Sequence, residues 1–159
     1  NVVLLGSYLI NETRNMLKSV GNFDIILFKG HPLIDVDIFR DVMGKNIKVI
    51  NENIYDLFPK TSLIIGSATG SLAEAIACGV SVVVVAQKHE LITNPLTDMG
   101  KGKMWDIAFN AIEIEQKMKK LLKFRTKNMD EIKGIANWYK DNLFIEPSKE
   151  NIVKTFELK

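Results

Sequence analysis

Five short apolar runs, rich in β-branched residues, alternate along the chain with segments of helical periodicity. Their apolar residues are continuous rather than alternating, which is typical of parallel strands that helices cover on both faces. The pattern predicts an α/β fold: a doubly wound, open, Rossmann-like parallel sheet with C-terminal helices. The five predicted strands are Val2 to Leu5, Asp24 to Phe28, Ile47 to Ile50, Ser62 to Ile65 and Ser81 to Val85.

Helical periodicity is clearest in three segments, 9–20, 112–124 and 130–143. A short helix is also expected after Asp35, burying Val36, Phe39 and Val42, and a single turn is expected between Asn53 and Asp56. Residues 86–106 contain Asn94-Pro95, Gly100 and Gly102 and show little periodicity. They predict a long loop at the rim of the sheet, which could close over a ligand.

The 159 residues fit one ordinary domain, 1–159. Because the sequence enters its first predicted strand at once, without an initiator methionine, we expect it to be cut from a longer protein. The net charge of +2, with both signs spread along the chain, indicates no nucleic-acid partner. The lysine-rich segment 117–123 is interpreted as a solvated helix face, because Glu113 and Glu115 share its helix.

Cys78 is the only cysteine, so no internal disulfide can form, and its apolar neighbours predict a buried, inert thiol. No apolar run approaches the roughly 20 residues that span a bilayer. No stable membrane insertion is therefore expected. These features predict a cytoplasmic location, with peripheral contact at the inner face of the membrane left open.

A candidate phosphate site follows the fourth strand, in the run Gly66-Ser67-Ala68-Thr69-Gly70-Ser71 that opens a helix. Unpaired N–H groups and the helix dipole favour an anion there, and Gly70 allows close approach to the backbone. Ser67, Thr69 and Ser71 add hydroxyl donors. Glu74, one turn later, could accept both hydroxyls of a ribose; alternatively it closes a capping box with Ser71.

Two further turns are expected at the same edge of the sheet, because ligands of open α/β sheets bind beyond the carboxyl ends of the strands. Lys29-Gly30-His31-Pro32 follows the second strand, and Pro32 restricts His31 to extended backbone. His31 could donate to a phosphate and neutralise a leaving nucleotide, or it could be an ordinary surface histidine. Gly6-Ser7 follows the first strand and could face the same crevice.

No metal or cofactor is expected. The only other histidine is His89, and Asp35-Val36-Asp37 is interpreted as a helix start rather than a magnesium clamp. The sequence also lacks a P-loop, a strand-linked Gly-x-Gly-x-x-Gly and a Gly-x-Ser-x-Gly elbow, which removes the common nucleoside-triphosphate, dinucleotide and serine-hydrolase interpretations.

Three of these segments, with the strand after Gly79, resemble the C-terminal domain of GT-B glycosyltransferases over residues 1–110: Lys29 to Pro32, Asn53 to Pro59 and Gly66 to Ala75. The resemblance is strongest to bacterial surface-polysaccharide and capsule transferases that carry a His-Pro motif and a Ser/Thr-rich motif. It implies that the sheet is the Rossmann-like, nucleotide-binding half of a GT-B fold, and that the chain is the C-terminal half of a longer two-domain enzyme.

That resemblance implies that His31 and the Ser67, Thr69 and Ser71 hydroxyls contact the donor's nucleotide phosphate, and that Glu74 binds its ribose. Many GT-B enzymes carry a second glutamate eight residues earlier, where this chain has Gly66. The departure favours the His-Pro group, with CMP-, CDP- or UDP-linked donors. The implied partner is a nucleotide sugar, and the implied acceptor-binding N-terminal domain is missing from this sequence.

The resemblance implies a transferase that moves a sugar, or a glycerophosphate-like group, during surface-polysaccharide biosynthesis. The isolated chain is expected to bind the donor or nucleotide without turnover. Two alternatives stay open: half of an enzyme similar to UDP-N-acetylglucosamine 2-epimerase, and a non-catalytic module that has kept the GT-B-like fold.

Overall fold

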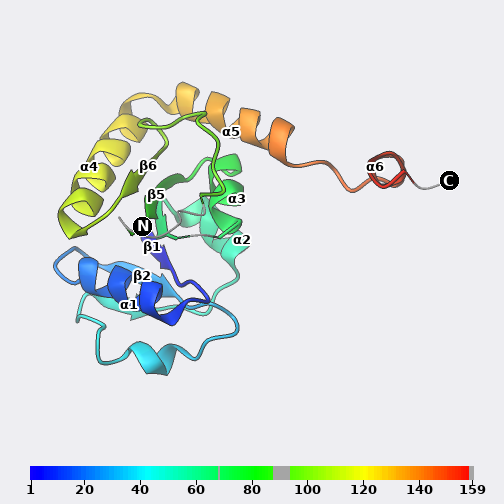
Figure 1. Cartoon of the computed structure of the whole chain (residues 1–159). Helices are drawn as coiled ribbons and strands as arrows, with labels where there is room; N and C mark the ends of the chain where they lie inside the picture. The colour runs from blue at the N-terminus through cyan, green and yellow to red at the C-terminus, as the bar shows by residue number, and fades with distance from the viewer. Residues whose placement is uncertain (68, 88–93, 158–159) are drawn as a thin grey trace.

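The computed structural model describes residues 1–67, 69–87 and 94–157. Their centre is an all-parallel sheet with the order β3-β2-β1-β4-β5-β6, in which β1 and β4 are neighbours (Figure 1). This strand order is that of doubly wound dinucleotide-binding folds. The strands are β1 Val2–Leu5, β2 Ile26–Lys29, β3 Ile47–Val49, β4 Leu63–Gly66, β5 Ser81–Val85 and β6 Trp105–Ala108.

Helices and short 3₁₀ turns connect the strands and complete the C-terminal part of the described chain. The α-helices are α1 Ile10–Ser19, α2 Ile54–Leu57, α3 Ser71–Ala77, α4 Ala111–Lys127, α5 Met129–Leu143 and α6 Lys149–Thr155; the 3₁₀ turns are η1 Val36–Phe39 and η2 Phe58–Lys60. Asp35 caps η1 and Asn53 caps α2 through their side chains. These two caps confirm the predicted helix starts.

Both faces of the sheet are buried, because successive residues of a strand point to opposite sides. On one face, Val3 and Ile64 pack in a core with α3 and α5. On the other, Leu4 and Ile65 pack in a core with α1, η1 and α4. This two-sided burial explains the continuous apolar runs in the sequence, and it confirms the predicted doubly wound α/β fold.

All five predicted strands are present; two have the predicted ends, and the ends of the other three differ by at most two residues. The prediction of an unbroken loop over 86–106 is wrong at its end, where Trp105 begins β6. This strand escapes sequence reading because it is four residues long and its second residue is Asp106, a charged side chain that lysines from α4 neutralise inside the fold. Residues 88–93 of the predicted loop lie outside the described residues.

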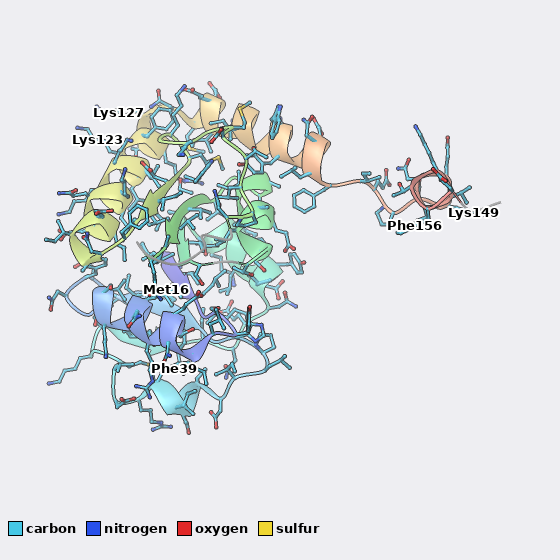
Figure 2. The ribbon with its side chains drawn as sticks, in the orientation of Figure 1. Met16, Phe39, Lys123, Lys127, Lys149 and Phe156 are labelled. Carbon is cyan, nitrogen blue, oxygen red and sulfur yellow. The ribbon has the colours of Figure 1, made fainter. Side chains whose placement is uncertain are left out.

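The C-terminal arm departs from the body beyond α5. Figure 1 shows α6 standing apart from the sheet and its covering helices, and α6 contains no buried residue. Its apolar side chains Ile152, Val153 and Phe156 are exposed, and Figure 2 shows Phe156 on this arm, remote from the core residue Met16. No helix among the described residues is both long and apolar enough to cross a membrane.

Candidate functional site

The register of the sheet brings the ends of three strands to one level. Leu5 of β1 pairs with Lys29 of β2, and Leu4 pairs with Ile65 of β4. The Gly6 N–H then donates to the Lys29 carbonyl over 2.9 Å. At β1 and β4 the connections leave toward opposite faces of the sheet, through α1 and α3. The turns after β1, β2 and β4 therefore surround the switch point where open α/β sheets bind ligands.

These three turns enclose a pocket of about 270 Å³, lined by Leu5, Gly6, Lys29, Gly30, His31, Pro32, Ile54, Thr69 and Ser71. The fold thus brings together six of the ten predicted site residues: Gly6, Lys29, His31, Pro32, Thr69 and Ser71. A second hollow of about 320 Å³ adjoins it, shares the wall from Lys29 to Pro32, and extends to Asp35, Ile50 and Asn51.

His31 is half-buried and its orientation is defined by its neighbours. Its Nδ1 accepts a hydrogen bond of 3.2 Å from the Leu33 N–H, so the neutral ring carries its proton on Nε2. The Tyr8 ring meets the imidazole edge-on, with centroids 6.3 Å apart. Nε2 is therefore the ring nitrogen that remains for a ligand.

Gly6 allows the turns after β1 and β2 to approach closely, because the two turns touch through their backbones. A Cβ at Gly6 would lie 3.1 Å from the His31 nitrogen and 3.3 Å from the Gly30 Cα. Lys29 supplies positive charge at the same wall. No carboxylate of the described residues forms an ion pair with its ammonium.

Ser7 supports the turn after β1 and lies outside the pocket lining. It is buried, and its hydroxyl accepts a 3.1 Å hydrogen bond from the Leu9 N–H. The Ser7 N–H donates to Thr13 Oγ1 over 2.9 Å, and that hydroxyl donates to the Ser7 carbonyl over 3.2 Å. These bonds tie the turn to the first turn of α1.

Ser67 is also buried and outside the lining, and its hydroxyl donates to Glu12 Oε2 over 2.7 Å. Glu12, on α1, was missed from the sequence. An acidic residue in the first turn of a helix is ordinary complementation of the helix dipole, so nothing local marks it as a partner of the turn after β4.

The start of α3 differs from the capping-box alternative. Gly70, in αR conformation, occupies the N-cap, and no side chain caps the helix; the Ser71–Glu74 capping box is therefore not formed. Leu72, Ala73 and Glu74 donate their N–H groups back to Thr69 or Gly70 carbonyls. Among the described residues, the N–H groups of Gly70 and Ser71 have no hydrogen-bond partner.

Glu74 lies outside the pocket lining, on the side of α3 that faces α2. The Tyr55 phenol is exposed, and Glu74 raises its pKa, first by accepting a hydrogen bond from the phenol and then through its negative charge. The same carboxylate is close to Cys78 at the end of α3.

The predicted burial of Cys78 is wrong, because the thiol is exposed. Helix α3 ends at Ala77, and the chain then turns through Gly79 with φ +79°.

The lysine-rich face of α4 is largely paired. Lys117 and Lys120 reach Asp106 of β6 at 2.9 and 3.3 Å, and Lys119 pairs with Glu115. Lys123 and Lys127 lie along the outer side of α4 (Figure 2). In the part of the chain that the structure describes, no three histidine, cysteine, aspartate or glutamate side chains gather as a metal site would require.

No protein-family model and no curated protein sequence matches the chain. Among solved structures, the chain is similar to the glycotransferase of kitacinnamycin, with a TM-score of 0.55 and 13% identity over 86% of this chain and 40% of that one. It is similar to the glycosyltransferase SnogD from Streptomyces nogalater, with a TM-score of 0.54 and 17% identity over 89% of this chain and 42% of that one.

TarM is a third similar structure, with a TM-score of 0.51 and 12% identity over 98% of this chain and 34% of that chain. The chain thus spans less than half the length of each of these three structures. At these identities the likeness establishes the fold alone: a six-stranded, all-parallel, Rossmann-like α/β domain.

Proposed function

We propose that this chain is the donor-binding domain of a glycosyltransferase and that the pocket at the ends of β1, β2 and β4 holds the phosphates of a nucleotide sugar. The observation that carries the proposal is that the turns after β1, β2 and β4 all contribute residues to the lining of one pocket. Lys29 supplies positive charge there, and His31, Thr69 and Ser71 supply hydrogen-bond donors. The similarity in fold to two proteins described as glycosyltransferases, the kitacinnamycin enzyme and SnogD, supports it.

In this proposal His31 donates from Nε2 to a phosphate oxygen while Leu33 holds its other nitrogen. The backbone at Gly70 and Ser71 supplies further donors at the positive end of α3. Gly6 keeps the two turns in contact, Pro32 restricts the histidine, and Glu74 accepts hydrogen bonds from the ribose. Ser7 and Ser67 lie outside the pocket lining and hold their turns in place through hydrogen bonds.

The proposed reaction is a direct displacement in a full enzyme that also has an acceptor-binding N-terminal domain. An acceptor hydroxyl attacks the anomeric carbon of the donor and gives its proton to a base on that other domain. The bond from the anomeric carbon to the phosphate oxygen breaks, and its electron pair leaves with the nucleotide. His31 and the start of α3 stabilise the charge that develops on the departing phosphate.

The His-Pro and Ser/Thr-rich motifs support a CMP-, CDP- or UDP-linked donor and a role in bacterial surface-polysaccharide or capsule biosynthesis on the cytoplasmic side of the membrane. The group transferred would be a sugar or a glycerophosphate-like unit. The isolated domain is expected to bind nucleotide and to transfer nothing.

Isothermal titration of the chain with CMP, CDP, UMP and UDP tests the proposal. His31→Asn is the informative variant, because its amide oxygen can still accept from the Leu33 N–H while Nε2 is lost. Loss of one charge-assisted hydrogen bond should raise the dissociation constant about tenfold. Lys119→Ala, on the outer side of α4, should leave it unchanged.

Ser71→Ala should weaken binding in the same way, without lowering the melting temperature, because no side chain caps the start of α3 and the Ser71 hydroxyl has no hydrogen-bond partner among the described residues. If none of the four nucleotides binds, the proposal is wrong and the chain is better explained as a non-catalytic module. Epimerisation of UDP-N-acetylglucosamine by a full-length protein would instead favour the epimerase-like alternative.

A further inference from the structure

The first turn of α1 holds two of the strand-end turns that surround the pocket. Thr13 binds both backbone groups of Ser7 after β1, through bonds of 2.9 and 3.2 Å. The preceding residue, Glu12, accepts the 2.7 Å bond from Ser67 after β4. One helical turn therefore connects the neighbouring strands β1 and β4 at the switch point of the sheet.

The Glu12–Ser67 bond determines what Ser67 can do. A serine hydroxyl has a single proton, and here it is directed to a carboxylate, so it is not available to a phosphate. Ser67 is 5% exposed and Glu12 is half-buried, which shields the bond from water and strengthens it. No lysine, arginine or histidine of the described chain forms an ion pair with Glu12.

We propose that Glu12 is a positioning residue of the donor site: it holds the Ser67 turn so that Thr69 and Ser71, two and four residues later, face the phosphates. This inference rests on the proposed function. Ser67 takes part in this positioning through its hydrogen bond to Glu12, and it contacts no ligand itself. The donor phosphates are bound by the groups on the pocket wall, namely Lys29, His31, Thr69 and Ser71.

A double-mutant cycle on UDP and CDP binding tests the proposal with the variants Glu12→Ala, Ser67→Ala and the pair together. If Glu12 acts through Ser67, each single change should raise the dissociation constant about tenfold, and the double variant should be no weaker than the weaker single one. Glu12→Gln should stay within about threefold of the parent chain, because its amide oxygen still accepts the Ser67 proton.

Glu115→Ala serves as the control, since it removes a carboxylate from α4 that pairs only with Lys119 in the described structure. Thermal melts of every variant separate binding from folding. Lower melting temperatures with unchanged nucleotide affinity would overturn the proposal and leave Glu12 a purely structural residue. Additive losses in the cycle would also overturn it, because Ser67 would then contact the ligand independently of Glu12.

The two proposals fail in distinguishable ways. If His31→Asn and Ser71→Ala weaken nucleotide binding while the Glu12 variants do not, the positioning role is wrong and the donor site stands. If the parent chain binds none of the nucleotides, both proposals are wrong.

Discussion

The buried phenol of Tyr139 on α5 donates a 3.0 Å hydrogen bond to the Thr97 carbonyl, 42 residues earlier in the chain. The same hydroxyl lies 3.3 Å from the Met99 carbonyl, which also accepts a 2.9 Å bond from the Trp105 indole. The segment before β6 is therefore held against α5 by hydrogen bonds from two buried aromatic side chains, Tyr139 and Trp105. Burial is the largest influence on the pKa of this phenol and raises it.

Tyr139→Phe should lower the free energy of unfolding by about 1–3 kcal/mol, because the Thr97 carbonyl loses its buried donor. Urea unfolding monitored by circular dichroism measures the change. Tyr55→Phe is a matched control: the Tyr55 ring is exposed, so this substitution should change the free energy of unfolding little. Equal effects of the two substitutions would contradict the structural role of the Tyr139 hydroxyl.

Gly70→Ala should leave the fold intact and weaken nucleotide binding. Gly70 has φ −56°, which alanine adopts easily, and an added Cβ would meet no described atom within 4 Å. The new methyl group would instead occupy space next to the backbone donors that we assign to the phosphate. Titration with UDP and a thermal melt test both parts, and an unchanged affinity would place Gly70 outside the ligand's footprint.

Gly6→Ala is the contrasting substitution, because its Cβ would crowd the backbone of His31 at 3.1 Å. We expect a loss of about 1–3 kcal/mol in the free energy of unfolding, typical of overpacking, together with weaker nucleotide binding. A Gly6→Ala variant as stable as the parent chain would show that the two turns separate without cost.

Asp106 should make stability depend on acid pH. Burial opposes its ionisation, but the Lys117 hydrogen bond, the Ile107 N–H, the charge of Lys117 and the Lys120 hydrogen bond outweigh burial and lower the pKa of Asp106. A carboxyl whose pKa is lower in the folded than in the unfolded state contributes stability above its ordinary value of about 3.9. That contribution is lost as the pH falls through the folded value.

The free energy of unfolding should therefore fall more steeply between about pH 5 and pH 2 in the parent chain than in Asp106→Asn. Urea unfolding at several pH values in this range measures the slope. Asp130→Asn is the control, since the Asp130 side chain is fully exposed. The same slope in all three proteins would rule out Asp106 as a source of the acid sensitivity.

Cys78 should react with iodoacetamide, because it is exposed, but more slowly near pH 8 than the cysteine of a short unstructured peptide. Partial burial, and then the negative charge of Glu74, raise the pKa of the Cys78 thiol and so reduce the thiolate fraction. Glu74→Gln should accelerate the reaction at a given pH. Equal alkylation rates in the parent chain and in Glu74→Gln would mean that the carboxylate does not influence the pKa of the thiol.

The sequence by itself determined the fold class and the edge of the sheet at which the pocket lies. Five continuous apolar runs separated by helical segments require a parallel sheet that is covered on both faces, and the polar turns after the strands mark its carboxyl edge. These features are periodic and local, so they can be read without knowledge of distant contacts. The pocket lined by Gly6, His31, Thr69 and Ser71 lies at that edge.

Only the tertiary structure decided the role of individual side chains. Ser67 meets Glu12, which is 55 residues away, and therefore turns from the pocket, although its place in the turn matches that of Thr69 and Ser71. Asp106 could be buried in β6 only because α4 brings Lys117 and Lys120 beside it. Such contacts depend on how helices pack across the sheet, and no local pattern of residues encodes that packing.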